Sequence, residues 1–254
     1  MLTDSYKVDK VLGQGQFGRV LLAKDRKTGH QVALKEILRQ ETPQDKLDVD
    51  LELLALLKAT GGHPRCHPNV VCYYGHFEAL PSKKAQRPVR YIAMEFVAGQ
   101  TLDKLKPNKL SSDDRLNILR TALAGLAFLH SHNIAHRDIK PANIIVRRNP
   151  ASGRLDAVLV DLGLSCFQGQ TRDNGAAECS IGAGSEYYMA PELRDKRLPY
   201  VASNWMRGDI YSLGISLYPL LGGLDLVQLM LQPESQHRPT AAQLLGELQQ
   251  RYGS

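Results

Sequence analysis

Hydrophobic periodicity divides the chain into two parts that differ in secondary structure. Over the first hundred residues, short β-branched and aromatic runs separated by turns predict five strands, at 6–13, 18–25, 31–37, 70–77 and 90–97. One helix is expected between the third and fourth strands. Thr42 caps it, leucines recur in it at helical spacing, and Gly61-Gly62 ends it. Beyond residue 100, helical patterns dominate, so we expect an α+β fold.

The second part combines three helices with two short strands. Ser111 and Asp114 open the first helix, residues 209–218 form a buried helix that ends before Pro219, and Thr240 caps the last one. Short strands are expected at 144–146 and 157–160, and residues 163–189 are rich in Gly and Ser, as in a mobile loop. With the boundary near Gly99–Gln100, two lobes joined by one hinge predict a cleft, where ligands commonly bind.

Charge and hydropathy favour an intracellular protein. The net charge of +6 over 254 residues is dispersed, and the densest basic stretch lies beside prolines in a predicted loop (Lys83, Lys84, Arg87 and Arg90). We interpret it first as a solvated loop and second as a patch for an acidic partner, and we expect no nucleic acid or membrane partner. The N-terminal residues lack the apolar run of a signal peptide, and polar residues interrupt the apolar stretch 215–231. A cytoplasmic location is therefore expected.

The four cysteines are not spaced like a disulfide framework, which favours a reducing compartment. One cluster has a metal-like composition, but its spacing matches no common zinc pattern: His63, Cys66, His67 and Cys72.

A glycine-rich segment, "GQGQFGRV" at 13–20, is the first candidate binding element. Glycines let a backbone approach phosphate closely. A dinucleotide-binding fold would need the segment to join a strand to a helix, whereas here it joins two predicted strands. A plain glycine hairpin is the other interpretation. Lys35 follows on the next strand, and Glu52 in the predicted helix is placed to orient it.

Polar residues gather again in "HRDIKPAN" at 136–143. Asn143 and Asp161 offer the hard oxygen ligands that Mg²⁺ takes beside a nucleotide. Asp138 is then left to orient an attacking hydroxyl group and to accept its proton. A simple polar surface loop is the alternative for this stretch taken alone.

Taken in order, these elements resemble the eukaryotic-type protein kinases over almost the whole chain. The resemblance rests on the following residues: Gly13, Gly15, Gly18, Lys35, Glu52, His136-Arg137-Asp138, Asn143, Asp161-Leu162-Gly163 and Ala190-Pro191-Glu192. It implies a bilobal fold in a single kinase domain over residues 1–254, with a β-rich N-lobe (1–99) and a helical C-lobe (100–254).

The resemblance also implies a role for each site residue, with ATP and Mg²⁺ as cofactors. Catalysis would rest on Asp138 as the base, on Lys140 as a charge balancer, and on Lys35 paired with Glu52. Asn143 and Asp161 would hold the metal. Met94 takes the gatekeeper position, and Thr101 stands where many relatives have an acidic ribose contact. The nucleotide would be bound by Leu12, Gly13, Gln14, Gly15, Gln16, Phe17, Gly18, Val20, Ala33, Lys35, Glu95, Val97 and Ile145.

Lys140, two residues after Asp138, and Gly184-Ser185 match the serine/threonine-specific branch of the resemblance. In relatives, the arginine before the base often meets a phosphate on the activation loop. We therefore expect autophosphorylation at Thr171 or Ser180, with Ser165 behind them. The alternative is a loop that is ordered without phosphate.

The chain departs from the family pattern in two places. Leu162 replaces the usual Phe. Only a short link joins residues 209–214 to "PESQHRPT", where relatives carry an extra helix and long loops, so part of the late helices is expected to be missing. Arg238 is expected to pair with Glu192, and Asp209 to brace the catalytic loop.

An active serine/threonine protein kinase that acts on protein substrates, itself included, is the leading hypothesis. A pseudokinase that binds ATP as a scaffold is the rival. A small-molecule or lipid kinase is disfavoured, because "APE" and the Gly-Ser element belong to protein-substrate recognition.

Overall fold

The computed structural model describes residues 1–15, 18–37, 66–167, 184–194 and 202–253. They belong to two compact units. The first comprises Met1–Cys66 and Val71–Ala98, and the second His67–Val70 and Gly99–Ser254. The helix expected between Thr42 and Gly61 lies outside the described residues.

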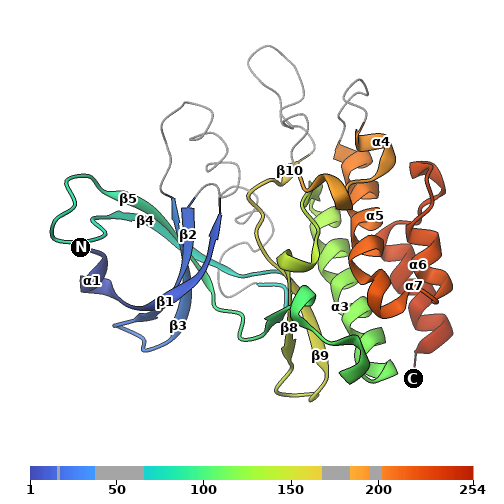
Figure 1. The fold of residues 1–254 in the computed structure, drawn as a ribbon, viewed down its shortest axis with the longest axis horizontal. Coiled ribbons are helices and arrows are strands. Elements are labelled where there is room, and N and C mark those ends of the chain that lie inside the picture. The colour runs from blue at the N-terminus through green and yellow to red at the C-terminus, as the bar shows by residue number, and fades with distance from the viewer. Residues whose placement is uncertain (16–17, 38–65, 168–183, 195–201, 254) are drawn as a thin grey trace, which may run out of the picture. The chain divides into compact units, whose positions relative to one another are not determined.

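The first unit is an antiparallel sheet of five strands with the order β1-β2-β3-β5-β4 (Figure 1). A short helix, α1 (Leu2–Ser5), precedes it. The strands are β1 (Tyr6–Gly15), β2 (Gly18–Asp25), β3 (Gln31–Ile37), β4 (Tyr73–Ala79) and β5 (Val89–Glu95). All five strands predicted from the periodicity are present, and β4 begins three residues later than expected.

Strand alternation gives the two faces of this sheet different contents. One face carries an apolar cluster that includes Leu21, Leu34 and Ala93, with Phe77 stacked on Tyr91 at a centroid distance of 5.4 Å. The opposite face carries the alternate residues of β2 and β3, among them Val20, Ala33 and Lys35, because residues two apart in a strand share a face.

A polar group crosses three strands on the apolar-cluster face. Glu36 is 1% exposed, pairs with Arg19 on β2, and accepts a hydrogen bond of 2.6 Å from the Tyr91 hydroxyl on β5. Burial and the hydrogen bond to Glu36 raise the pKa of Tyr91. A buried carboxylate satisfied in this way ties β2, which follows the glycine-rich segment, to the centre of the sheet.

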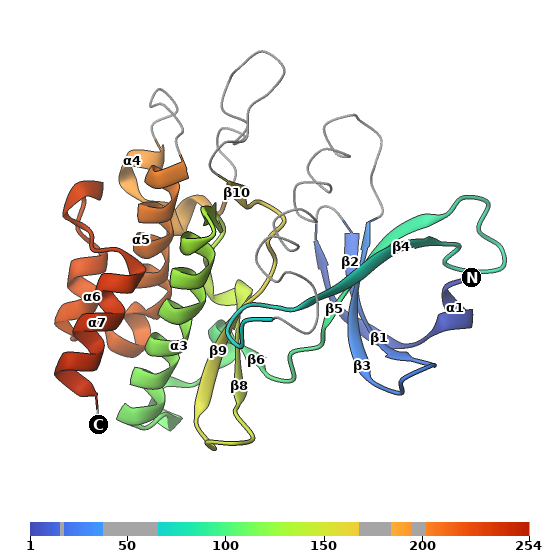
Figure 2. The same ribbon diagram turned by 180° about the vertical axis from the view of Figure 1, so that it is seen from behind.

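The second unit is mainly helical, and α3, α5, α6 and α7 lie side by side in it (Figure 2). Its helices are α3 (Ser112–Ser131), α4 (Pro191–Arg194), α5 (Ala202–Leu221), α6 (Asp225–Met230) and α7 (Ala241–Tyr252). The predicted caps are confirmed. Ser111 accepts a hydrogen bond from the Asp114 N–H at 3.0 Å, and Thr240 forms a capping box with Gln243.

Two small sheets complete the second unit. One has the order β6-β8-β9 and the other pairs β10 with β7. Their strands are β6 (Gln100–Thr101), β7 (Ile134–Ala135), β8 (Ile144–Arg148), β9 (Leu155–Leu159) and β10 (Cys166–Phe167). The hairpin β8–β9 confirms the two short strands that were predicted.

Two expectations about the late helices need correction. Helix α5 does not end before Pro219 but continues to Leu221. Pro219 is exposed and lies in the last turn, so it deprives only the Ile215 carbonyl of a helical donor. The link expected after α5 itself contains a helix, α6, whose Leu226, Val227 and Met230 are buried.

The late start of β4 has a structural cause. Residues 67–70 pack within the second unit, where Val70 bridges Leu159 and the Asn69 side chain donates to the Ala157 carbonyl at 2.9 Å. Their backbone groups are therefore used outside the five-stranded sheet, and the strand forms only from Tyr73 onwards.

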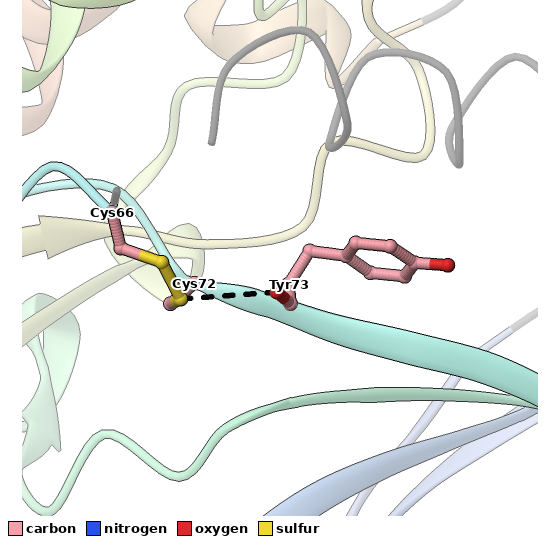
Figure 3. The surroundings of a disulfide bond; sticks show 3 residues. All are labelled: Cys66, Cys72 and Tyr73. Carbon is pink, nitrogen blue, oxygen red and sulfur yellow. Dashed lines mark hydrogen bonds between the residues drawn. A yellow bond between two sulfur atoms is a disulfide. The ribbon is translucent and has the colours of Figure 1, made fainter. Parts of the chain in front are cut away.

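Cys66 and Cys72 flank this segment and are joined by a disulfide, with their Cα atoms 5.4 Å apart (Figure 3). The Tyr73 carbonyl oxygen lies 3.8 Å from Cys72 Sγ. The expectation that the cysteines remain reduced is wrong for this pair. A cysteine-based metal cluster is also excluded here, because metal binding requires free thiolates.

Among the described helices, none combines the length and the apolar character needed to cross a membrane.

Candidate active site

The segment His136–Asn143 joins β7 to the β8–β9 hairpin and is unusually buried for a polar loop. His136, Arg137 and Asp138 are exposed by 7% or less. Arg137 has φ 69°, in the left-handed region, which costs a non-glycine residue on the order of 1–3 kcal/mol. Such a conformation persists only where the surroundings hold it.

Asp209 on α5 supplies the main restraint. Its carboxylate accepts hydrogen bonds from the backbone N–H groups of His136 and Arg137, both at 2.8 Å, and lies 3.1 Å from His130 Nε2. Asp209 is 1% exposed, so these bonds form in a medium that strengthens them. The expected bracing of the catalytic loop by Asp209 is confirmed as a set of contacts.

Both oxygens of the Asp138 carboxylate are engaged by neighbouring polar groups. Oδ1 accepts from the Ser185 backbone N–H at 3.1 Å and from the Ser185 hydroxyl at 2.8 Å. Oδ2 accepts from Asn143 Nδ2 at 2.9 Å and lies 2.7 Å from Lys140 Nζ. One carboxylate therefore organises a hydroxyl, an amide and an ammonium group.

Lys140 and Ser185 also contact each other, since Lys140 Nζ donates to Ser185 Oγ at 2.9 Å. The hydroxyl thus lies between a carboxylate and an ammonium group. This close approach depends on Gly184, which has φ 120°, and a Cβ there would lie 2.6 Å from the Arg137 carbonyl oxygen. Any larger residue at position 184 would push the Ser185 hydroxyl away from Asp138.

Asn143 and Asp161 are the candidate metal ligands, and the β8–β9 hairpin places them at the same end. Ile144 pairs with Leu159, and the Val160 N–H donates to the Asn143 carbonyl at 3.0 Å. Asn143 Nδ2 is held by Asp138, which leaves the amide oxygen as the ligand atom. Asp161 is exposed and has φ 64°. One amide oxygen and one carboxylate fit Mg²⁺, which keeps waters and phosphate oxygens as its other ligands.

No group of three or more His, Cys, Asp or Glu side chains that could hold a metal occurs in the part of the chain that the structure covers. A metal ion at Asn143 and Asp161 would therefore depend on ligands supplied by a nucleotide.

The candidate nucleotide residues of the first unit lie on the sheet. Gly15 pairs with Gly18, so the glycine-rich segment connects two antiparallel strands, as expected. Val20, Ala33 and Lys35 share one face of the sheet. Leu12, Gly13 and Gln14 are exposed on β1, Glu95 ends β5, and Val97 is buried just after it. Ile145 belongs to the second unit, where it pairs with Thr101.

Three of the predicted site residues lie outside the described residues: Gln16, Phe17 and Glu52. Thr171 and Ser180 also lie outside them. Ser165 is described and is 6% exposed, with its hydroxyl donating to the Leu162 carbonyl at 2.7 Å. A hydroxyl that is buried and bonded in this way is a poor phosphorylation site in this conformation.

Sequence reasoning missed two side chains that contact this loop. His130 reaches Asp209, and the Trp205 ring lies against Arg137, whose Cζ is 4.2 Å from the ring centroid. Trp205 precedes Asp209 by four residues in the predicted helix, so the i, i+4 spacing of a helix was the available signal.

Away from the loop, the expected pairing of Arg238 with Glu192 is present, and Arg238 is fully buried. This ion pair links the start of α4 to the segment just before α7.

Comparison with known proteins gives this geometry a family. The family model described as the protein kinase domain matches residues 6–228. The chain belongs to the protein kinase family. This membership confirms the predicted α+β kinase fold.

The curated relatives are serine/threonine kinases in name. CBL-interacting serine/threonine-protein kinase 20 of Arabidopsis thaliana is 28% identical over 88% of the chain and 46% of the relative. Calcium-dependent protein kinase 4 of Plasmodium falciparum is 28% identical over 88% and 38%. CBL-interacting protein kinase 16 of Oryza sativa subsp. japonica is 30% identical over 86% and 43%. The chain spans less than half the length of these relatives.

Proposed function

We propose that residues 1–254 form one kinase domain that transfers the γ-phosphate of ATP to serine and threonine hydroxyls of protein substrates, including its own. The observation that carries the proposal is the environment of the Ser185 hydroxyl. An aliphatic hydroxyl lies 2.8 Å from Asp138 Oδ1 and 2.9 Å from Lys140 Nζ. A substrate serine or threonine entering beside it would meet the same carboxylate and ammonium group.

In this proposal Asp138 orients the substrate hydroxyl and takes its proton as the oxygen bonds to the γ-phosphorus. The bond from the γ-phosphorus to the bridging oxygen breaks at the same time, and ADP leaves. Lys140 offsets negative charge on the phosphoryl group in transfer. Both roles are positioning and electrostatic, and such effects dominate phosphoryl-transfer catalysis.

Nucleotide binding is assigned to the residues that the family resemblance indicates. Lys35 would hold the α- and β-phosphates and pair with Glu52, while the glycine-rich segment covers the phosphates. Glu95 and Val97 would offer backbone groups to the base. Leu12, Val20, Ala33 and Ile145 would contact its faces. When bound, Mg²⁺ at Asn143 and Asp161 would neutralise phosphate charge.

The rival function is a pseudokinase scaffold that binds ATP without transferring phosphate. Its support is the short connection between α5 and α7, which contains only α6. The contacts around Asp138 favour catalysis, because a scaffold has no need of a carboxylate, an ammonium group and a hydroxyl within 3 Å of one another.

The test measures phosphate transfer from Mg-ATP to a generic basic protein and to the chain itself. Wild type is compared with Asp138→Asn, and the phosphorylated amino acid is identified. Phosphoserine or phosphothreonine from wild type alone is the expected result. ATP binding by wild type without any transfer would instead establish the scaffold.

A further inference from the structure

Trp205 is the one tryptophan of the chain, and its side chain is 1% exposed. It lies in the first turns of α5, and the Arg137 guanidinium is stacked over its ring at 4.2 Å. Arg137 is itself 7% exposed, and it makes further interactions besides this one. A guanidinium removed from water needs compensation, and indole is the best ring face for a cation.

Trp205 and Asp209 are four residues apart on α5, so they lie on the same face of the helix. Asp209 binds the backbone N–H of Arg137, and Trp205 contacts its guanidinium. One helix face therefore holds both ends of a residue whose backbone is in the left-handed region.

The contact lies close to the candidate base. Arg137, Asp138, Ser185, Trp205 and Asp209 line one small enclosed cavity of about 10 Å³. A space of this size holds at most about one water molecule. Movement of the Arg137 side chain is therefore transmitted to the backbone that carries Asp138.

We propose that Trp205 is a positioning residue, whose ring holds Arg137 so that the catalytic loop keeps its working geometry without a phosphate on the activation loop. This inference rests on the proposed kinase activity. It favours the second of the two alternatives raised by the sequence, in which the loop is ordered without phosphorylation. Without the ring, Arg137 leaves its left-handed conformation, and Asp138 loses its alignment with Ser185 and Lys140.

The first arm of the test separates the ring face from simple burial. Trp205→Phe keeps an aromatic face, whereas Trp205→Leu keeps only apolar volume. We expect kcat to fall less than about threefold in the Phe variant and about 10- to 30-fold in the Leu variant, with KM for ATP within about twofold. Equal losses in the two variants would overturn the proposal.

A matched control lies on the same helix. Tyr211 contacts a different cation, with Arg238 Cζ 5.4 Å from its ring centroid, away from Asp138. Tyr211→Leu should lower the melting temperature without changing kcat by more than about twofold. A kcat loss in Tyr211→Leu as large as in Trp205→Leu would show that general destabilisation of α5 explains both, and would overturn the proposal.

The second arm tests independence from phosphate. The double variant Thr171→Ala/Ser180→Ala should keep kcat within about twofold of wild type, because Trp205 remains. A loss of tenfold or more in this double variant would overturn the proposal.

A third arm does not need phosphate transfer. Because Trp205 is the sole tryptophan, its fluorescence reports the contact with Arg137 directly. Arg137→Met should change the emission of the folded protein, and unchanged emission would refute the contact. If wild type transfers no phosphate, the proposed function fails. If wild type is active and Trp205→Leu is equally active, only the role of Trp205 fails.

Discussion

The substitution Asp209→Asn tests how the catalytic loop is held. It preserves shape but replaces one carboxylate oxygen by an NH₂ group. In the structure, Oδ1 accepts from the Arg137 N–H, while Oδ2 accepts from the His136 N–H and lies beside His130 Nε2. In either amide orientation, one buried backbone N–H then faces another donor.

The loss can be worked out from these contacts. The better orientation keeps the amide oxygen on the Arg137 N–H and turns the NH₂ group towards His130, which can accept a hydrogen bond as a neutral ring. The His136 N–H is then left unpaired, at a cost of about 1–3 kcal/mol, and the remaining bond loses its charge assistance. Together we expect about 3 kcal/mol, or a fall of roughly 6–12 °C in melting temperature.

Activity should fall further than stability suggests, because Asp138 follows the two residues that Asp209 holds. A misplacement of about 1 Å at a reacting group can cost about 100-fold in rate. The assay combines thermal unfolding with kcat on a protein substrate. The control is Asp225→Asn, whose carboxylate is 86% exposed and 3.8 Å from Arg251, and which should change stability by less than about 0.5 kcal/mol. A loss below about 1 kcal/mol in Asp209→Asn, with kcat retained, would refute this reasoning.

Three further predictions concern other parts of the chain. Gly184→Ala should destabilise the protein by at least about 2 kcal/mol in denaturant titration, since its Cβ would meet the Arg137 carbonyl and its φ is unfavourable; unchanged stability would contradict this close approach. Burial lowers the pKa of His67 below 6.5, so the unfolded state binds that proton first and stability should fall as pH drops below about 6.5. His67→Gln should reduce this fall, and an identical pH profile would contradict the assignment. Removing the Cys66–Cys72 disulfide with Cys72→Ser should cost about 2 kcal/mol under oxidising conditions, as expected for so short a loop. The same variant measured against reduced wild type should show little difference.

Local signals in the sequence were sufficient for much of the fold. The strand of Lys35 follows from alternation, and the starts of α3 and α7 follow from Ser111 and Thr240, because caps and periodicity act over a few residues. The order of residues in "HRDIKPAN" was likewise enough to suggest the site, since the chemistry needs those groups on one short loop.

The features that were missed depend on contacts between distant residues. The late start of β4 follows from the packing of Asn69 and Val70 on β9, which no local pattern reports. Helix α5 passes Pro219 because that residue lies in an exposed last turn. The contact of Trp205 with Arg137 joins residues 68 positions apart, and only the tertiary structure shows it.

The most direct test of the central assignment is the single-turnover rate of phosphate transfer in Asp138→Asn at saturating Mg-ATP. The control is Asp113→Asn, an exposed aspartate in the first turn of α3. If Asp138 positions the hydroxyl and accepts its proton, Asp138→Asn should lose about 10²- to 10⁴-fold in rate while its ATP affinity stays within about twofold of wild type. Equal transfer rates in Asp138→Asn and Asp113→Asn would contradict the assignment of Asp138 as the base.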